Sequence, residues 1–268
     1  MKKSSLIRID HLLQRCWTIY TNKYKHFLVI PIIMMAIFAA VGYLISFFIS
    51  RTSQALTENE TIFTAIINPR GATVYVIFLA IIIAVIVQAV GIIALIFSAT
   101  KNNAKLSIGD SIRQAFDNFW KFIGISALVI LINIIVTILA YIPAILLGII
   151  VYFIYPSQFS IIFTALSIIP ALASLIYVFW FIFAYFEMIN NKGVVKALIN
   201  SKQLIKGRWW KVFWRILIMY IIVLLVGLIF RFIPYFGTII TFLVFIPLNI
   251  IYMFVLHEDL KIQTNTKV

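Results

Sequence analysis

Long, nearly uninterrupted runs of apolar residues dominate the chain, and short polar stretches separate them. A helix needs about 20 apolar residues to cross a bilayer. Five runs reach this length, at residues 27–49, 73–97, 161–186, 212–230 and 233–256. Their residues do not alternate between apolar and polar, as the strands of a membrane barrel would. The pattern therefore predicts an all-α polytopic membrane protein.

A sixth run, residues 122–155, is too long for one upright span and too short for two. Pro143 lies inside this run, and Pro156 follows it. A proline inside a span removes a backbone hydrogen bond and kinks the helix. We therefore expect one span that ends near Ile142, followed by either a kinked extension or an interfacial helix up to Tyr155. The expected total is six transmembrane helices.

The composition agrees with this class. Apolar residues make up 64% of the 268 residues and charged residues 11%, with a mean hydropathy of +1.11. Soluble domains are roughly half apolar and a quarter charged, so a soluble domain and a disordered chain are both excluded. The single cysteine, Cys16, excludes an internal disulfide. Because residues 1–26 are largely polar and the first apolar run exceeds a signal core, we expect that run to remain in the membrane.

The basic residues predict the orientation, because Lys and Arg accumulate on the cytoplasmic side of a membrane. With the N-terminus inside and six spans, only Arg51, Arg70 and Arg231 of the 22 basic residues lie outside. The other 19, with six of the eight acidic residues, leave the inner face with a net charge of +13. We therefore expect a multi-pass protein of a prokaryotic cytoplasmic (inner) membrane, with both termini in the cytoplasm. Anionic membrane lipids are the expected partners. Nucleic acid is not an expected partner, because the basic residues flank the spans, as they do in membrane proteins generally.

Three polar stretches, residues 6–20, 108–119 and 194–207, each precede a pair of spans. Their apolar residues recur at the helical period, which predicts an amphipathic helix in each stretch. Ser107 and Asp110 form a capping pair at the start of the second helix. Each of these helices is expected to lie in the membrane interface.

The stretches also predict an internal repeat. Trp120-Lys121 and Trp210-Lys211 occupy corresponding positions, directly before a span. The prediction is three parallel units, each an interfacial amphipathic helix followed by a two-span hairpin. The units cover about residues 5–98, 104–187 and 193–257 of a single integral membrane domain, residues 1–268.

Aromatic and basic residues at such hinges hold helices at the membrane interface. They can also contact lipid headgroups or a membrane or cytoplasmic protein partner. The candidates for this contact are Lys121, Lys202, Lys206, Arg208, Trp209, Trp210 and Lys211. Inside the spans, the polar candidates are Gln88, Asn133 and Asn249. These amides either bond neighbouring helices or line a path for a solute.

Ionisable residues inside spans would indicate function, and the sequence offers almost none. The histidines lack Cys or His partners at metal-ligand spacing, and no glycine-rich phosphate loop or intramembrane carboxylate pair is present. We therefore expect no enzyme, no metal and no cofactor.

Two single residues and one short segment have expected structural roles. We expect Glu187, at the inner end of the fourth span, to form an interfacial salt bridge with Lys192 or Lys196. The segment 257–259 follows the last span and is expected to begin a solvated tail. Cys16 lies on the apolar face of its helix and is expected to be packed rather than reactive.

One segment resembles a known family. The span that ends in Glu187 is followed by a helix and a hinge whose matching residues are Ala197, Ser201, Leu204, Gly207, Trp210 and Lys211. An earlier copy of the hinge contains Ala115-Phe116 and Phe119-Trp120. The pattern is similar to the six-span membrane domain found beside some bacterial glycerophosphoryl diester phosphodiesterases, and alone in related uncharacterised bacterial membrane proteins.

The resemblance covers residues 108–256 by motif and the whole chain by span order. It departs at Asn200, where the family often has a basic residue, and in the long apolar stretch to Tyr155. It implies a six-span fold rather than phosphodiesterase activity, which belongs to a separate soluble domain.

The expected function is that of an integral membrane protein without catalytic chemistry, which interacts with lipid or acts as a scaffold. The alternative is a transporter or channel component for a lipidic or neutral solute, with the three intramembrane amides along its path. An intramembrane enzyme ranks last, because no nucleophile with a base is apparent.

Overall fold

The computed structural model describes residues 7–55, 72–100, 107–189, 193–230 and 236–265. Every regular element in these ranges is helical, which confirms the all-α class. Six helices there are long and apolar enough to cross a membrane, as expected of a multi-pass protein. They are Tyr24–Phe48, Tyr75–Thr100, Phe119–Ile154, Pro156–Ser174, Trp209–Phe230 and Phe242–Thr264.

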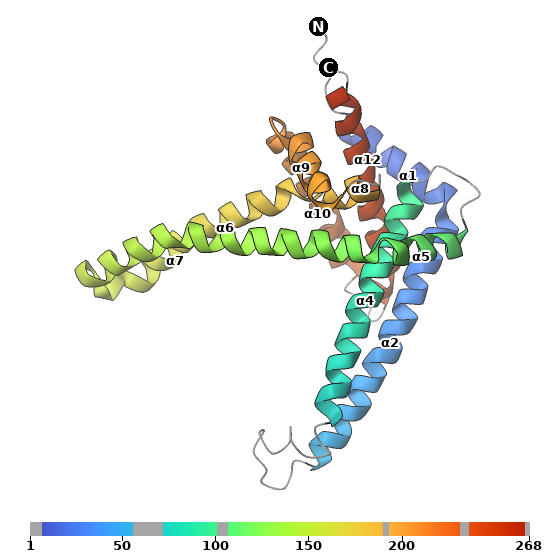
Figure 1. The fold of residues 1–268 in the computed structure, drawn as a ribbon, viewed down its shortest axis with the longest axis horizontal. Coiled ribbons are helices and arrows are strands. Elements are labelled where there is room, and N and C mark those ends of the chain that lie inside the picture. The colour runs from blue at the N-terminus through green and yellow to red at the C-terminus, as the bar shows by residue number, and fades with distance from the viewer. Residues whose placement is uncertain (1–6, 56–71, 101–106, 190–192, 231–235, 266–268) are drawn as a thin grey trace. The chain divides into compact units, whose positions relative to one another are not determined.

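Figure 1 shows the helices, coloured in their order along the chain. The first half contains α1 (Ile9–Asn22), α2 (Tyr24–Ala55), α4 (Ala72–Thr100), α5 (Ile108–Asp117) and α6 (Phe119–Ile154). The second half contains the 3-10 turn η2 (Pro156–Gln158), α7 (Phe159–Trp180), α8 (Ala184–Ile189), α9 (Val194–Ile205), α10 (Trp209–Phe230), α11 (Phe236–Ile240), the π-helical turn η3 (Thr241–Phe245) and α12 (Ile246–Asn265).

The chain divides into two compact units. Unit 1 comprises Met1–His11, Trp120–Ile221 and Val255–Val268, and unit 2 comprises Leu12–Phe119 and Ile222–Phe254. Both units combine segments that are distant in the sequence. This division does not test the predicted threefold repeat, which stays a prediction.

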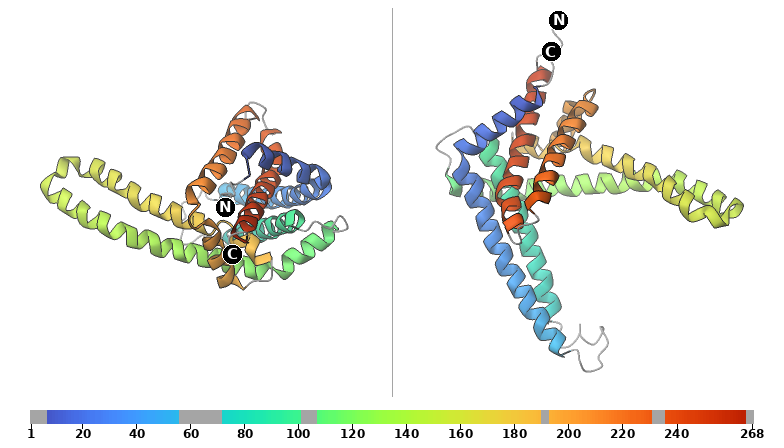
Figure 2. Two further views of the ribbon diagram at one scale, coloured as in Figure 1. Left: turned by 90° about the horizontal axis from the view of Figure 1, so that it is seen from above. Right: turned by 180° about the vertical axis from the view of Figure 1, so that it is seen from behind.

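In unit 2, α2 and α4 lie side by side, as Figure 1 and Figure 2 both show. Lys23 Nζ donates a hydrogen bond to the Ser98 carbonyl at 2.9 Å, which joins the start of α2 to the end of α4. Ser98 Oγ lies 3.2 Å from Ser111 Oγ, which joins α4 to α5. The predicted cap of α5 forms a complete capping box between Ser107 and Asp110.

In unit 1, α6 and α7 form a long hairpin (Figure 1; Figure 2). A Cβ atom at Gly148 would lie 2.8 Å from the ring of Phe163, so only glycine lets α7 approach this closely. Near the base of the hairpin, a core formed by Ile125, Phe181, Ala184, Met188, Ala197 and Leu198 joins α6 to α8 and α9.

The structure corrects the expectation for residues 122–155. The helix does not end near Ile142; α6 continues through Pro143 to Ile154, so the extension belongs to the same helix and is not a separate interfacial helix. A proline removes only one helical hydrogen bond, and the apolar residues on both sides keep the helical pattern. With 36 residues, α6 is longer than the roughly 20 residues that one upright crossing needs.

Two other boundaries also differ. The expected span 161–186 breaks after Trp180, and a turn separates α7 from α8. The expected solvated tail at residues 257–259 was wrong, because α12 continues to Asn265 and buries His257 and Asp259. Both differences depend on polar contacts with distant residues.

Candidate functional site

The break between α7 and α8 positions a buried polar cluster in unit 1. The amide of Ala184 donates to the carbonyl of Phe181 at 2.9 Å, so the Trp180 carbonyl lacks its helical partner. Ser201 Oγ from α9 donates to that carbonyl at 2.8 Å. A side chain 21 residues away thus satisfies the backbone group that the break exposes.

Glu187, in α8, is the centre of this cluster, and its side chain is only 2% exposed. Its Oε1 atom lies 2.8 Å from His257 Nε2 and 3.7 Å from Lys261 Nζ, both in α12. Asn200 Nδ2, in α9, donates to Oε2 at 3.2 Å. We name these four residues the Glu187 cluster. It brings three helices of unit 1 together around one buried carboxylate.

The Glu187 cluster replaces the expected interfacial salt bridge. Lys192 lies outside the described residues, and the Lys196 side chain is exposed whereas Glu187 is buried. Asn200, the position at which the chain departs from the family pattern, is one of the observed partners. The sequence offered no local signal for this arrangement, because Glu187 and His257 are 70 residues apart.

The imidazole of His257 packs against aromatic rings on α8 and beside it. Its ring centroid lies 5.7 Å from that of Phe183 and 5.7 Å from that of Phe186. Its Nδ1 atom is buried and has no hydrogen-bond partner among the described residues. Within those residues, no group of three His, Cys, Asp or Glu side chains is placed to hold a metal ion. The observed contacts of the cluster are those of a packed polar network between helices.

A second polar group joins α10 to Ile7 and to α12. Arg215 Nη1 lies 3.8 Å from Asp259 Oδ2, and the same Oδ2 accepts from the Ile7 amide at 3.1 Å. Arg215 also donates to the Ile7 carbonyl. Arg215 falls inside the predicted span 212–230, so an ionisable residue in an apolar run was a signal that our sequence analysis missed.

Among the predicted hinge residues, most of the side chains are exposed. Lys121, Lys202, Lys206, Trp210 and Lys211 all face outward from unit 1, and we name these five residues the hinge surface. Lys202 Nζ lies 4.7 Å from the centre of the Trp180 ring, within range of a cation–π interaction. Trp210 is 64% exposed, which is unusual for so large an apolar side chain.

The remaining two hinge candidates are half-buried and make internal contacts. Arg208 donates to the carbonyls of Leu260 and Gln263, at 3.5 and 3.3 Å, and so binds the last turns of α12. Trp209 stacks on Phe213 with ring centroids 5.1 Å apart. These contacts are structural, so we leave Arg208 and Trp209 out of the hinge surface.

Two of the three predicted intramembrane amides share one pocket. Gln88 from α4 and Asn249 from α12 line a pocket of about 510 Å³ in unit 2. The third amide, Asn133, lies on α6 in unit 1 and does not line it. The sequence identified the polar residues, but only the fold of unit 2 shows which of them meet.

Comparisons of the chain with protein-family models, with curated proteins and with solved structures find no match.

Proposed function

We propose that the protein is a non-enzymatic integral membrane protein that binds anionic lipid headgroups at the cytoplasmic face of a prokaryotic inner membrane. Both termini are cytoplasmic in this proposal, because 19 of the 22 basic residues then lie inside. The helices α1, α5 and α9 occupy the interface beside the spans that follow them.

The observation that carries the proposal is the hinge surface. Its four lysines are exposed, and Lys121 and Lys211 each follow an exposed tryptophan at the start of a candidate span. Trp120 is 78% exposed and Trp210 64% exposed. Tryptophan prefers the headgroup region, and each lysine near an anionic surface contributes about 1 kcal/mol. The two residue types together favour a lipid surface over water.

The test is native mass spectrometry of the protein in mild detergent, with phosphatidylglycerol as the anionic lipid and phosphatidylcholine as the neutral reference. The variant is Lys202→Gln, Lys206→Gln and Lys211→Gln combined. At about 1 kcal/mol per lysine, we expect phosphatidylglycerol to bind roughly 100-fold more weakly, with phosphatidylcholine binding unchanged.

The matched control removes the same number of charges from the opposite side, as Arg51→Gln, Arg70→Gln and Arg231→Gln combined. The proposal expects this control to bind phosphatidylglycerol more tightly than the lysine variant does. Equal losses in the two variants would show that binding follows net charge, and would contradict a specific hinge surface. A protein partner recovered in place of lipid would also overturn the proposal.

A second candidate function is a transporter or channel component for a lipidic or neutral solute. The observation that favours it is the shared pocket of Gln88 and Asn249. If it is correct, glycerol flux into liposomes falls in Gln88→Leu and Asn249→Leu but persists in Asn133→Leu, which changes an amide of unit 1. Flux that is unaffected by the first two substitutions would remove this pocket from the path.

A further inference from the structure

We infer that the pocket of unit 2 is a binding site for an uncharged amphiphile, a hydrocarbon chain that carries a hydroxyl, ester or amide group. The polar group would bond to Gln88 and Asn249, and the chain would pack on the apolar wall. This site goes beyond the headgroup surface proposed above. It also requires no flux, because a molecule can bind there without crossing the membrane.

The location of the pocket supports a ligand from the bilayer. Its lining residues come from the candidate spans Tyr24–Phe48, Tyr75–Thr100 and Phe242–Thr264. Gln88 lies well inside its span, and its side chain is exposed. An amide at that depth is surrounded by hydrocarbon unless another polar group approaches it.

The usual explanation for such amides is a hydrogen bond between helices. The described residues show none for either side chain. Asn249 Oδ1 is buried and has no hydrogen-bond partner among them, and no partner is seen there for Gln88. An unbonded buried amide costs about 1–3 kcal/mol. Two amides in one pocket therefore present donors and acceptors that a ligand could satisfy.

The remainder of the wall defines the class of ligand. It consists of six apolar side chains, Met34, Phe38, Ile92, Phe242, Ile246 and Ile250. Among the residues that the structure describes, none that lines the pocket is charged, so a charged headgroup would be buried there without a counter-ion, which is costly. The volume of about 510 Å³ falls within the roughly 300–1,000 Å³ of small-molecule sites. These features fit an uncharged polar group joined to a hydrocarbon chain.

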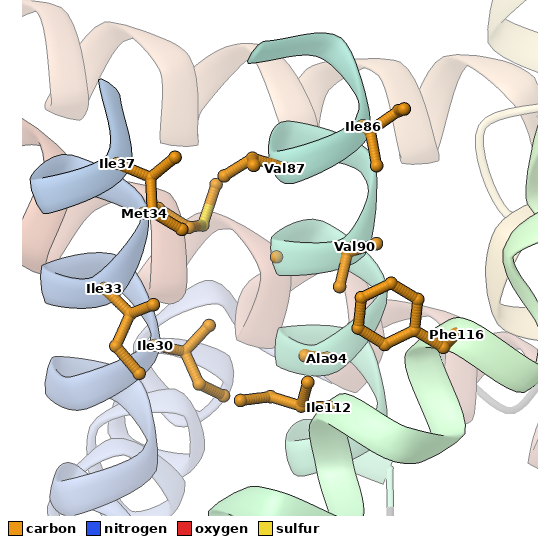
Figure 3. Close-up of a pocket in the computed structure, with 11 residues that line it drawn as sticks. Ile30, Ile33, Met34, Ile37, Ile86, Val87, Val90, Ala94, Ile112 and Phe116 are labelled. Carbon is orange, nitrogen blue, oxygen red and sulfur yellow. The ribbon is translucent and has the colours of Figure 1, made fainter. Parts of the chain in front are cut away.

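Met34 limits the pocket on the side of α2. It also lines a second, smaller cavity of about 150 Å³, which is shown in Figure 3. Ile112 and Phe116 of α5 close that cavity, and all of its lining residues are apolar apart from Gly91. A Cβ atom on Gly91 would lie 2.1 Å from the Met34 sulfur, so Met34 packs directly on the α4 backbone. The amides thus belong to the larger pocket alone.

The test uses 1-monooleoylglycerol as the uncharged probe and oleate, with the same chain, as the charged one. Native mass spectrometry in mild detergent measures their binding. We expect 1-monooleoylglycerol to bind more tightly than oleate, and its binding to weaken about tenfold in the Gln88→Leu, Asn249→Leu double variant, since one or two hydrogen bonds are lost. Asn133→Leu makes the same chemical change at membrane depth in unit 1 and should leave binding unchanged.

Equal binding of 1-monooleoylglycerol to the wild type and the double variant would overturn the site, as would equal losses in the double variant and Asn133→Leu. If the double variant fails to fold, Gln88→Leu alone gives the same test, because that side chain is exposed. Phosphatidylglycerol binding, measured in the same samples, should not change. The proposal for the pocket and the proposal for the hinge surface can therefore be contradicted independently of each other.

Discussion

The carboxylate of Glu187 and the imidazole of His257 lie 2.8 Å apart, Oε1 to Nε2, although 70 residues separate them in the chain. Both side chains are buried. The contact joins α8 to α12 and places the end of α12 inside unit 1. A segment that the sequence presents as a polar tail is therefore part of a packed core.

Replacing Glu187 by Leu should destabilise the protein strongly. Without the carboxylate, the buried His257 Nε2 and the Asn200 Nδ2 lose their hydrogen-bond partner, and each unsatisfied group typically costs about 1–3 kcal/mol. We expect the apparent melting temperature in detergent to fall by on the order of 10 °C. Asp117→Asn, at an exposed carboxylate at the end of α5, is the control and should change little. Equal melting temperatures for the two variants would show that the pair contributes no stability.

Replacing Ser201 by Ala should weaken the turn between α7 and α8. The Trp180 carbonyl would lose the donor that replaces its helical partner, at a cost of about 1–3 kcal/mol. Ser167→Ala is matched to it, since the Ser167 hydroxyl donates to the Thr164 carbonyl within α7 itself. Thermal unfolding followed by circular dichroism should show a clear loss for Ser201→Ala and a small one for Ser167→Ala. The reverse order would mean that the break does not depend on Ser201.

Cys16 should resist alkylation in the folded protein. Burial raises the pKa of its thiol from 9.0 to about 12, and the thiolate is the reactive species. At pH 8 the folded protein should react with iodoacetamide about 1,000-fold more slowly than the denatured chain does. Since Cys16 is the single cysteine, intact-protein mass spectrometry reports its modification directly. Similar rates in the two states would show that α1 does not bury the thiol.

The same raised pKa predicts a pH dependence with a definite sign. Above about pH 9 the unfolded chain loses the thiol proton while the folded protein keeps it. The folded state then binds more protons, so the contribution of Cys16 to stability falls as the pH rises from 9 towards 12. Cys16→Ser, compared with the wild type across this range, isolates the effect. If the difference in melting temperature between Cys16→Ser and the wild type stayed constant from pH 9 to pH 12, the predicted pH dependence would be contradicted.

Local signals account for the features that the sequence analysis predicted correctly. The length of an apolar run depends only on consecutive residues, and the structure has a candidate span in each of the predicted regions. The capping box of α5 is also local, because Ser107 and Asp110 are three residues apart. The amides Gln88 and Asn249 could likewise be recognised as polar residues inside apolar runs.

The errors arose where distant residues decide the structure. The break after Trp180 has no proline or glycine to mark it, and the hydroxyl of Ser201 stabilises it from another helix. The continuation of α12 past Leu256 depends on Glu187 and Arg215, which lie far upstream. A polar segment after a span looks the same in the sequence whether it meets water or buried partners.

The sequence by itself therefore determined the class of protein, because an apolar run of this length is stable as a helix in a bilayer whatever its neighbours are. Only the tertiary structure decided which polar groups meet. It placed Glu187 against His257 and Gln88 in one pocket with Asn249, and it brought the half-buried Arg208 into contact with the last turns of α12. The physical reason is that hydrogen bonds and ion pairs act over a few ångströms in space, whereas the pattern of a sequence reports only on residues that are near one another along the chain.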